Sequence, residues 1–259
     1  MTQTLERPAR RRASGPRGPR GARPRSRVLT WVGRLLLTAG VLIGLYGVYE
    51  LFVTDVIAES ERTEIAEEWR TDHEPIGHEP IGTGGGTEHR EDFPVLEGGS
   101  GTLGMLHVPR WDGDGSGDRY EVPIGAGSGD DVLDSGQLGH YSKTQPIGGE
   151  GNAGLSGHRT THGKPLREVH QLQDGDALVV ESEDAWLVYR VVARDIVKPH
   201  QSEVLDPIPP FEGADQTGTG RYLTLTTCDP IFGITDRYII WAEADYWTPK
   251  SEGLPPALT

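Results

Sequence analysis

Seven short runs of alternating apolar and polar residues limit what the second half of the chain can fold into. Successive side chains of a β-strand point to opposite faces, so this alternation indicates strands with one buried face. Clusters of Gly, Pro and Asp separate the runs, as turns require. With little helical periodicity between them, we expect an all-β fold that closes into a barrel rather than a doubly wound sheet. The runs cover residues 103–108, 120–124, 153–157, 177–181, 186–197, 222–227 and 237–244.

Two other stretches of this region stand out. A short helix is expected over residues 165–172, where Pro165 suits a first turn and Leu166 and Val169 share one side. Residues 199–220 carry no periodic pattern and form a long connection just before the run that ends at Cys228. Long connections in compact domains are often functional, which makes this one a candidate border of a site.

An apolar segment over residues 28–53 is predicted to cross a membrane. Its last 19 residues hold one charge, Glu50, and that length of helix spans about 28 Å, close to the hydrocarbon thickness of a bilayer. Ten arginines among residues 1–53 favour a cytoplasmic N-terminus and an extracellular body. A cleaved signal peptide is the alternative, but no small-residue cleavage site follows the segment.

The charge of the chain differs between its two ends. Beyond residue 53 it carries 15 basic and 37 acidic residues, and such a body repels polyanions, which argues against a nucleic-acid partner. Composition then divides the chain into five parts. These are a disordered basic cytoplasmic tail over 1–27, a transmembrane anchor over 28–53, a juxtamembrane helix and flexible Pro/Gly-rich linker over 54–101, a folded catalytic body over 102–250 and a tail over 251–259.

Two patterns suggest metal ions, and each has a plainer explanation. The tandem repeat HEPIG supplies His73 and His78, but two imidazoles in a flexible linker make a poor site. Residues 112–118 match the first half of a calcium loop, yet Pro123 stands where the loop needs a glutamate. A Gly/Asp-rich turn is the favoured interpretation, and we expect no metal and no cofactor in the active site.

Cys228 is the only cysteine of the chain. Lacking a partner, it is either a small buried apolar residue or a nucleophile, and its place at a strand end favours the nucleophile. A thiol attacks as the thiolate, which a nearby imidazolium or guanidinium stabilises, and attack on an amide creates an oxyanion that needs a fixed donor. Arg237 opens the next run, where antiparallel pairing would bring it close to Cys228. The alternative is an ordinary surface arginine.

Three histidines are candidates for the acid–base partner. His158 follows a strand of small residues and is favoured, with His140 second and His162 interpreted as an exposed turn residue. Two acids, Asp229 and Asp236, lie between the cysteine and the arginine. Their charges oppose a thiolate, which must therefore rely on His158 and Arg237.

Together these residues resemble the sortase family. Its T-L-x-T-C signature is present as residues 224–228, its arginine follows on the next strand as Arg237, and its histidine closes a small-residue strand as His158. The longer run through Gly139-His140-Tyr141 and Gly157-His158-Arg159 is similar to class E sortases of high-GC Gram-positive bacteria. The resemblance covers residues 102 to 247, and the apolar anchor before them also matches.

The resemblance implies an eight-stranded sortase β-barrel and a transpeptidase. Such enzymes cut a C-terminal sorting signal, LPxTG or LAxTG, between Thr and Gly. Cys228 would carry the thioacyl intermediate, His158 would act as general acid and then base, and Arg237 would hold the oxyanion. The implied partners are secreted proteins that bear the signal and a peptidoglycan precursor whose amine accepts them.

The residues that would bind the signal are less closely defined. Thr226 and Thr227 are expected to line the pocket, Tyr141 to contact the second residue of the signal, and His140 to lie at the rim. Two other classes stay open. One is another cell-wall cysteine peptidase or amidase, such as an NlpC/P60 hydrolase or an L,D-transpeptidase, and the other is a non-catalytic wall-binding β module.

Overall fold

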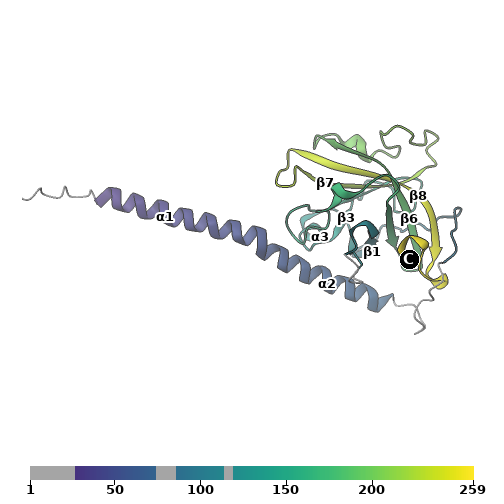
Figure 1. Ribbon diagram of the computed structural model, residues 1–259, viewed down its shortest axis with the longest axis horizontal. Coiled ribbons are helices and arrows are strands. Elements are labelled where there is room, and N and C mark those ends of the chain that lie inside the picture. The colour runs from purple at the N-terminus through teal and green to yellow at the C-terminus, as the bar shows by residue number, and fades with distance from the viewer. Residues whose placement is uncertain (1–26, 74–85, 114–118) are drawn as a thin grey trace, which may run out of the picture. The chain divides into compact units, whose positions relative to one another are not determined.

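A computed structural model of the chain describes residues 27–73, 86–113 and 119–259 (Figure 1). The basic tail, His78 and most of the calcium-like stretch lie outside these residues. The chain divides into two units, residues 1–45 and 46–259.

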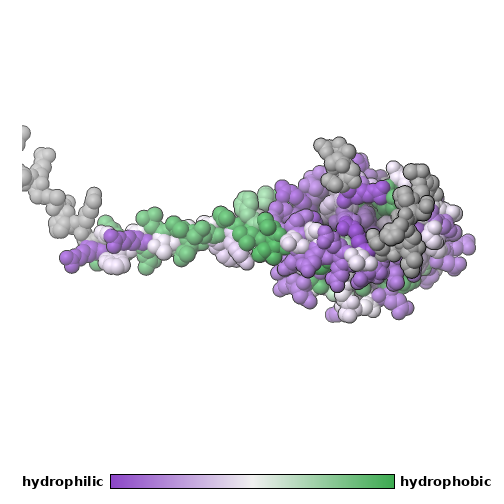
Figure 2. Space-filling model, turned by 90° about the horizontal axis from the view of Figure 1, so that it is seen from below, coloured by the Kyte–Doolittle hydropathy of each residue, from purple (hydrophilic) through white to green (hydrophobic). Residues whose placement is uncertain are grey.

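The apolar segment forms helix α1, Arg27–Val48, followed by a π-helical turn, η1, Tyr49–Val53. None of the residues of α1 is buried, and apolar residues cover it in Figure 2. An apolar helix without a buried residue needs an apolar environment around it. By length and composition α1 is able to cross a membrane.

The second unit is a closed barrel of eight strands in the order β1-β2-β3-β4-β7-β8-β6-β5, which confirms the predicted all-β fold. Pairs β2/β3 and β4/β7 are parallel, and the other neighbours are antiparallel. The strands are β1 Thr102–His107, β2 Glu121–Ala126, β3 Leu138–His140, β4 Gly151–Ser156, β5 Ala177–Glu181, β6 Ala185–Val197, β7 Arg221–Asp229 and β8 Asp236–Pro249.

Alternation along β7 separates the barrel interior from its outer face. Leu223 and Leu225 belong to the main apolar core, with Ile240 and Ala242 of β8. The residues that alternate with these leucines along β7, Tyr222, Thr224 and Thr226, therefore point to the opposite face. That face is also buried, because the β6–β7 connection lies over it.

Two short elements differ from the sequence prediction. Strand β3 has only three residues, too few for an alternating pattern, and was not predicted. Residues 165–172 hold only a 3-10 turn, η3, Val169–Gln171, instead of the expected helix. Leu166, Val169 and Leu172 are all fully buried, and their spacing of three residues matches the three residues per turn of a 3-10 helix.

Two segments outside the predicted strands, part of the expected linker and the C-terminal tail, pack on the barrel. Residues 86–101 of the expected linker are held by bridges from His89 to Trp247 and from Leu96 to Ile147. The C-terminal segment after β8 returns to the barrel, where Leu258 packs in a second apolar cluster. Long-range apolar contacts hold both segments, and composition alone does not reveal such contacts. The remaining short elements are η2 Pro109–Trp111, α3 Asp130–Leu133, η4 Ser202–Leu205, η5 Lys250–Glu252 and η6 Pro256–Leu258.

Helix α2, Thr54–Asp72, corresponds to the expected juxtamembrane helix and packs against the barrel. Ala66 and Trp69 form an apolar cluster with Met105 of β1. Arg70, near the C-terminal end of α2, makes an ion pair with Glu121 of β2. Contacts along the helix thus attach it to the same unit as the barrel.

Asn152 of β4 fixes the β6–β7 connection over the outer face of the sheet. Its side-chain nitrogen donates to the carbonyl oxygens of Val204 (3.2 Å) and Asp206 (3.1 Å). Its side-chain oxygen accepts a hydrogen bond of 2.6 Å from Thr224 of β7. Asn152 and Thr224 are both fully buried, so their side chains have no access to bulk water.

Asn152→Ala should destabilise the protein by about 2–4 kcal/mol, because it leaves two loop carbonyls without donors. Thr224→Val is the matched control: it keeps the side-chain shape, removes one hydrogen bond and should cost about 1 kcal/mol. Urea unfolding of the full chain measures both. Equal losses from the two variants would contradict the anchoring role assigned to Asn152.

Candidate active site

Three neighbouring strands bring the predicted catalytic residues to one end of the barrel. Cys228 of β7 is the direct cross-strand partner of Arg237 of β8. Partners in register have side chains on the same face of the sheet, so the guanidinium and the thiol share the outer face. Both residues are partly exposed. The predicted juxtaposition of cysteine and arginine is therefore present.

His158 reaches the same level from the other side of β7. Strands β4 and β7 run parallel with Ser156 opposite Thr226, and the amide of Gly157 donates to the Thr226 carbonyl at 3.2 Å. Two residues further along each strand lie His158 and Cys228. The His158 ring hydrogen-bonds to Asp134, Nε2 to Oδ1 at 3.0 Å. It makes no hydrogen bond with Cys228, and catalytic contacts are often loose before substrate binds.

The guanidinium of Arg237 is oriented by its own turn. Its Nη1 donates to the carbonyl oxygens of Ile234 (3.1 Å) and Asp236 (2.9 Å). An arginine has five N–H donors in a fixed fork, so two such bonds hold the plane while further donors remain for a ligand. This geometry suits a fixed donor for an anion close to Cys228.

Each acid that flanks the cysteine has a basic partner. Asp229 makes an ion pair with Arg159, and Asp236 pairs with Lys198 at 2.5 Å. The hydrogen bond from Lys198, with a second one from Thr235, holds the pKa of Asp236 below its usual range. The sequence raised the concern that both acids oppose a thiolate, and in the folded chain each negative charge is balanced locally.

Arg159 is the site residue that sequence reasoning missed. It is buried, and its Nη1 also donates to the Cys228 carbonyl at 3.1 Å. The guanidinium lies over the ring of Tyr238 of β8, 5.3 Å from its centroid. Its place directly after His158 was the available signal, but a buried arginine is recognised only from its partners.

The predicted substrate-binding threonines face different ways. Thr226 shares the face of Cys228, and its hydroxyl lies 2.9 Å from the hydroxyl of Tyr141. Thr227 points the other way, where its hydroxyl donates to the Gly157 carbonyl at 2.7 Å. Thr226 and Tyr141 thus stand together beside Cys228, while Thr227 ties β7 to the end of β4.

His140 has a structural environment. It is 6% exposed, and its Nε2 lies 2.9 Å from the Gln145 carbonyl. It lines a cavity with Val95 and Leu103, and none of its hydrogen bonds reaches Cys228, His158 or Arg237. Its place at the rim of a substrate pocket stays a prediction.

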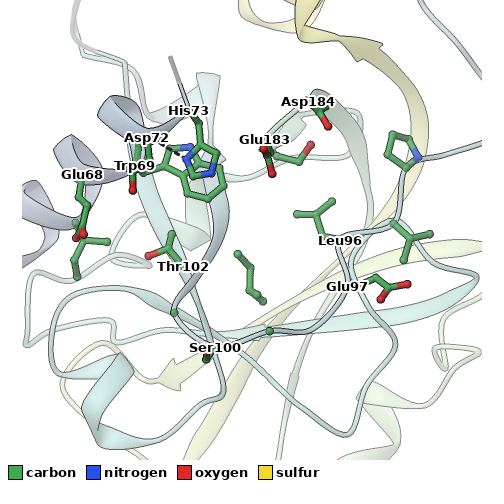
Figure 3. A pocket seen from close by; sticks show the side chains of 17 residues that line it. Glu68, Trp69, Asp72, His73, Leu96, Glu97, Ser100, Thr102, Glu183 and Asp184 are labelled. Carbon is green, nitrogen blue, oxygen red and sulfur yellow. Dashed lines mark hydrogen bonds between the residues drawn. The ribbon is translucent and has the colours of Figure 1, made fainter. Parts of the chain in front are cut away.

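A larger cavity, of about 720 Å³, lies away from these residues (Figure 3). Trp69 and His73 stand on one side of it, and Leu96 and Glu97 on the other. The rings of Trp69 and His73 stack with centroids 3.9 Å apart. The lining includes no predicted catalytic residue, so cavity size alone would point to the wrong place.

Arg159→Met should slow alkylation of the Cys228 thiol by roughly tenfold at neutral pH. The substitution leaves the negative charge of Asp229 unpaired beside the thiol, and a like charge disfavours the thiolate. The double variant Arg159→Met/Asp229→Asn removes that charge and should recover most of the rate. Iodoacetamide labelling measured by mass spectrometry provides the rates.

The double variant tests whether Arg159 acts by balancing the charge of Asp229. If Arg159 acts only by supporting the fold, the added Asp229→Asn change leaves labelling as slow as in Arg159→Met. Circular dichroism of each variant checks that the barrel is intact.

Comparison with known proteins gives one consistent result. The family model of the sortase domain matches residues 106–245. Sortase SrtE1 of Streptomyces coelicolor is 35% identical over 98% of this chain and 67% of its own length. Sortase SrtE2 of the same organism is 33% identical over 87% of each chain.

Solved structures agree with these sequence relatives. The SrtA sortase from Actinomyces oris is 40% identical, with a TM-score of 0.60 over 66% of this chain and 96% of that one. Sortase E1 from Streptomyces coelicolor, solved with a tripeptide in its active site, is also 40% identical, with a TM-score of 0.56 over 62% of this chain and 97% of that one. With the sortase-domain match over more than half of the chain, these likenesses establish that the protein belongs to the sortase family of cysteine transpeptidases.

Proposed function

We propose that this sortase cuts a C-terminal sorting signal of the LAxTG or LPxTG kind between Thr and Gly and transfers the protein to a cell-wall amine. The pairing of Cys228 with Arg237 across β7 and β8 carries the proposal. It sets a candidate nucleophile beside a fixed positive donor, in the T-L-x-T-C context of the family. The Streptomyces coelicolor relative with a tripeptide in its active site supports a peptide substrate.

The proposed reaction uses three side chains, Cys228, His158 and Arg237. The Cys228 thiolate attacks the threonine carbonyl, and the carbonyl electrons move to an oxyanion that Arg237 stabilises. Collapse breaks the Thr–Gly bond as His158 protonates the leaving amine, which leaves a thioester on Cys228. The acceptor amine then attacks the thioester, His158 takes its proton, and the thiolate returns.

Thr226 and Tyr141 are proposed to contact the sorting signal. They stand on the face that holds Cys228 and are joined by their hydroxyls. The β6–β7 connection, held by Asn152, borders the same face. Thr227 and His140 are retained as weaker candidates, because their polar atoms already serve contacts within the barrel.

The proposed location is the cell membrane of a Gram-positive bacterium. Helix α1 is long and apolar enough to cross the bilayer, and the arginines before it favour a cytoplasmic N-terminus. The barrel then faces the wall, where secreted proteins that bear the signal and peptidoglycan precursors are the partners. The other open classes are disfavoured: an NlpC/P60 hydrolase or an L,D-transpeptidase places its cysteine elsewhere, and a wall-binding module needs no Cys–Arg pair.

Transpeptidation by the full chain should require the Cys228 thiol. Incubated with an LAxTG or LPxTG peptide and an amine, the wild type should give the transfer product and a thioacyl adduct visible by mass spectrometry. Cys228→Ala should give neither, since no other cysteine exists to replace it. Turnover of Cys228→Ala at the wild-type rate would refute the proposal.

Arg237→Gln should lower kcat by about 10²–10³-fold, the loss typical of removing one oxyanion donor. Arg221 is the first residue of β7 and donates to the Gly148 carbonyl. It lies seven positions before Cys228 along the strand, away from the proposed reacting groups. Arg221→Gln is therefore the matched control and should leave kcat within a few-fold. Steady-state kinetics on one peptide measure both variants, and similar losses would show that Arg237 has no special role.

A further inference from the structure

Asp134, His158 and His162 meet at the end of β4 from two segments, the end of α3 and the loop that follows β4. The Nε2 atoms of His158 and His162 lie 3.0 and 3.7 Å from Oδ1 of Asp134. The two imidazole rings lie 4.9 Å apart, tilted by 30°. One donor atom from each of the three residues lies within 4.8 Å of the others. From the sequence, His162 was predicted to be an exposed turn residue, but its side chain is only 21% exposed.

Two imidazoles and one carboxylate form a ligand set that suits zinc. Zinc prefers four ligands at about 2.0–2.2 Å in a tetrahedron, which puts ligand atoms roughly 3.5 Å apart. The present separations between the ligand atoms therefore require only small shifts of the side chains to reach that geometry. Sites with three protein ligands keep a fourth position for water. Asp134 is 48% exposed, so solvent and ions reach this cluster directly.

Helix α2 fixes the two loops that supply Asp134 and His162. Gly136 and Gly163 both pack on Ala58 of α2, and a Cβ on Gly136 would lie 3.0 Å from the Ala58 carbonyl oxygen. Asp55 of α2 pairs with Lys164 and accepts a 3.3 Å hydrogen bond from the Gly163 amide. A ligand set on such supported loops is held in place before an ion arrives.

We propose that Asp134, His158 and His162 bind a zinc-class divalent cation reversibly and that this binding switches the transpeptidase off. The proposed inhibition rests on the proposed function, in which His158 is the acid–base residue, whereas the proposed metal binding does not depend on that function. A metal on an imidazole nitrogen occupies the lone pair that a proton would take. Metal-bound His158 cannot be an imidazolium and keeps only the weakly acidic proton of its other ring nitrogen. The leaving amine is then not protonated, and the first half-reaction stops at the tetrahedral adduct.

Inhibition by soft metals has a second common source in thiol enzymes, the thiolate itself. Cys228 Sγ is not among the atoms that make up the cluster. Two variants therefore distinguish the two sources. Cys228→Ala keeps the cluster and removes the thiolate, and it still binds the ion if the cluster is the site. His162→Gln keeps the thiolate and removes one ligand of the cluster, and it still binds the ion if the thiolate is the site. Comparing them decides which group holds the ion.

The binding test uses the full chain in detergent, as the Cys228→Ala variant, titrated with Co²⁺ as a spectroscopic substitute for Zn²⁺. One equivalent should give visible d–d absorption of four- or five-coordinate cobalt, and Zn²⁺ should displace it. Adding His162→Gln or Asp134→Asn should weaken binding at least tenfold. The control is His170→Gln, an exposed histidine outside the cluster (49% exposed), which should leave the titration unchanged.

The activity test measures peptide transfer by the chain with its thiol intact. Zn²⁺ should inhibit it, a chelator should restore it, and His162→Gln should need at least tenfold more Zn²⁺ for the same inhibition. Cobalt binding that disappears in Cys228→Ala, or that survives His162→Gln unchanged, would overturn the proposal. Absence of transfer without any metal would instead count against the proposed function, while the cobalt spectra still report on the site.

Discussion

Strand β7 lies between β4 and β8, and its two registers hold the candidate catalytic residues at one end of the barrel. A slip of one residue against β8 would turn Cys228 away from Arg237 and move Leu223 and Leu225 out of the core. Burial of the leucines therefore fixes the position of the thiol, because a register that moved the thiol would also expose Leu223 and Leu225. The parallel pairing with β4 extends the constraint to His158, which follows the last paired residue, Ser156, by two positions.

Charge balance around the cysteine depends on contacts that cross between strands. Arg159, directly after His158, neutralises Asp229, directly after Cys228, and also binds the Cys228 carbonyl. The same side chain thus balances the charge of the acid next to the cysteine and contacts the backbone that carries the thiol. A buried arginine is stable only with such partners, so the Arg159–Asp229 pair and the geometry of β4 and β7 depend on each other.

Local pattern predicted the strands and the Cys228–Arg237 pair, because alternation and a short turn determine both. It did not predict β3, whose three residues carry no period, or the 3-10 turn that replaced a helix over residues 165–172. It also missed Asp134 and Arg159, whose importance comes from partners far away in the chain. The place of His140 at a pocket rim stays a prediction, because its contact with the Gln145 carbonyl is local and its neighbours across the cavity are distant in the chain. The predictions therefore succeeded where neighbours in sequence decide the structure.

Helix α2 gives these distant contacts a common support. It follows the apolar helix in the chain, contacts β1 and β2 near its C-terminal end, and meets the loops of Gly136 and Gly163 near its start. Those loops carry the partners of His158, so the histidine side of the active site rests on a segment outside the barrel. The cysteine and arginine sides rest on the pairing of β7 with β8 and, through Arg159, on the segment that follows β4. Loosening of α2 would therefore disturb the contact of His158 with Asp134 before it disturbed the pairing of Cys228 with Arg237.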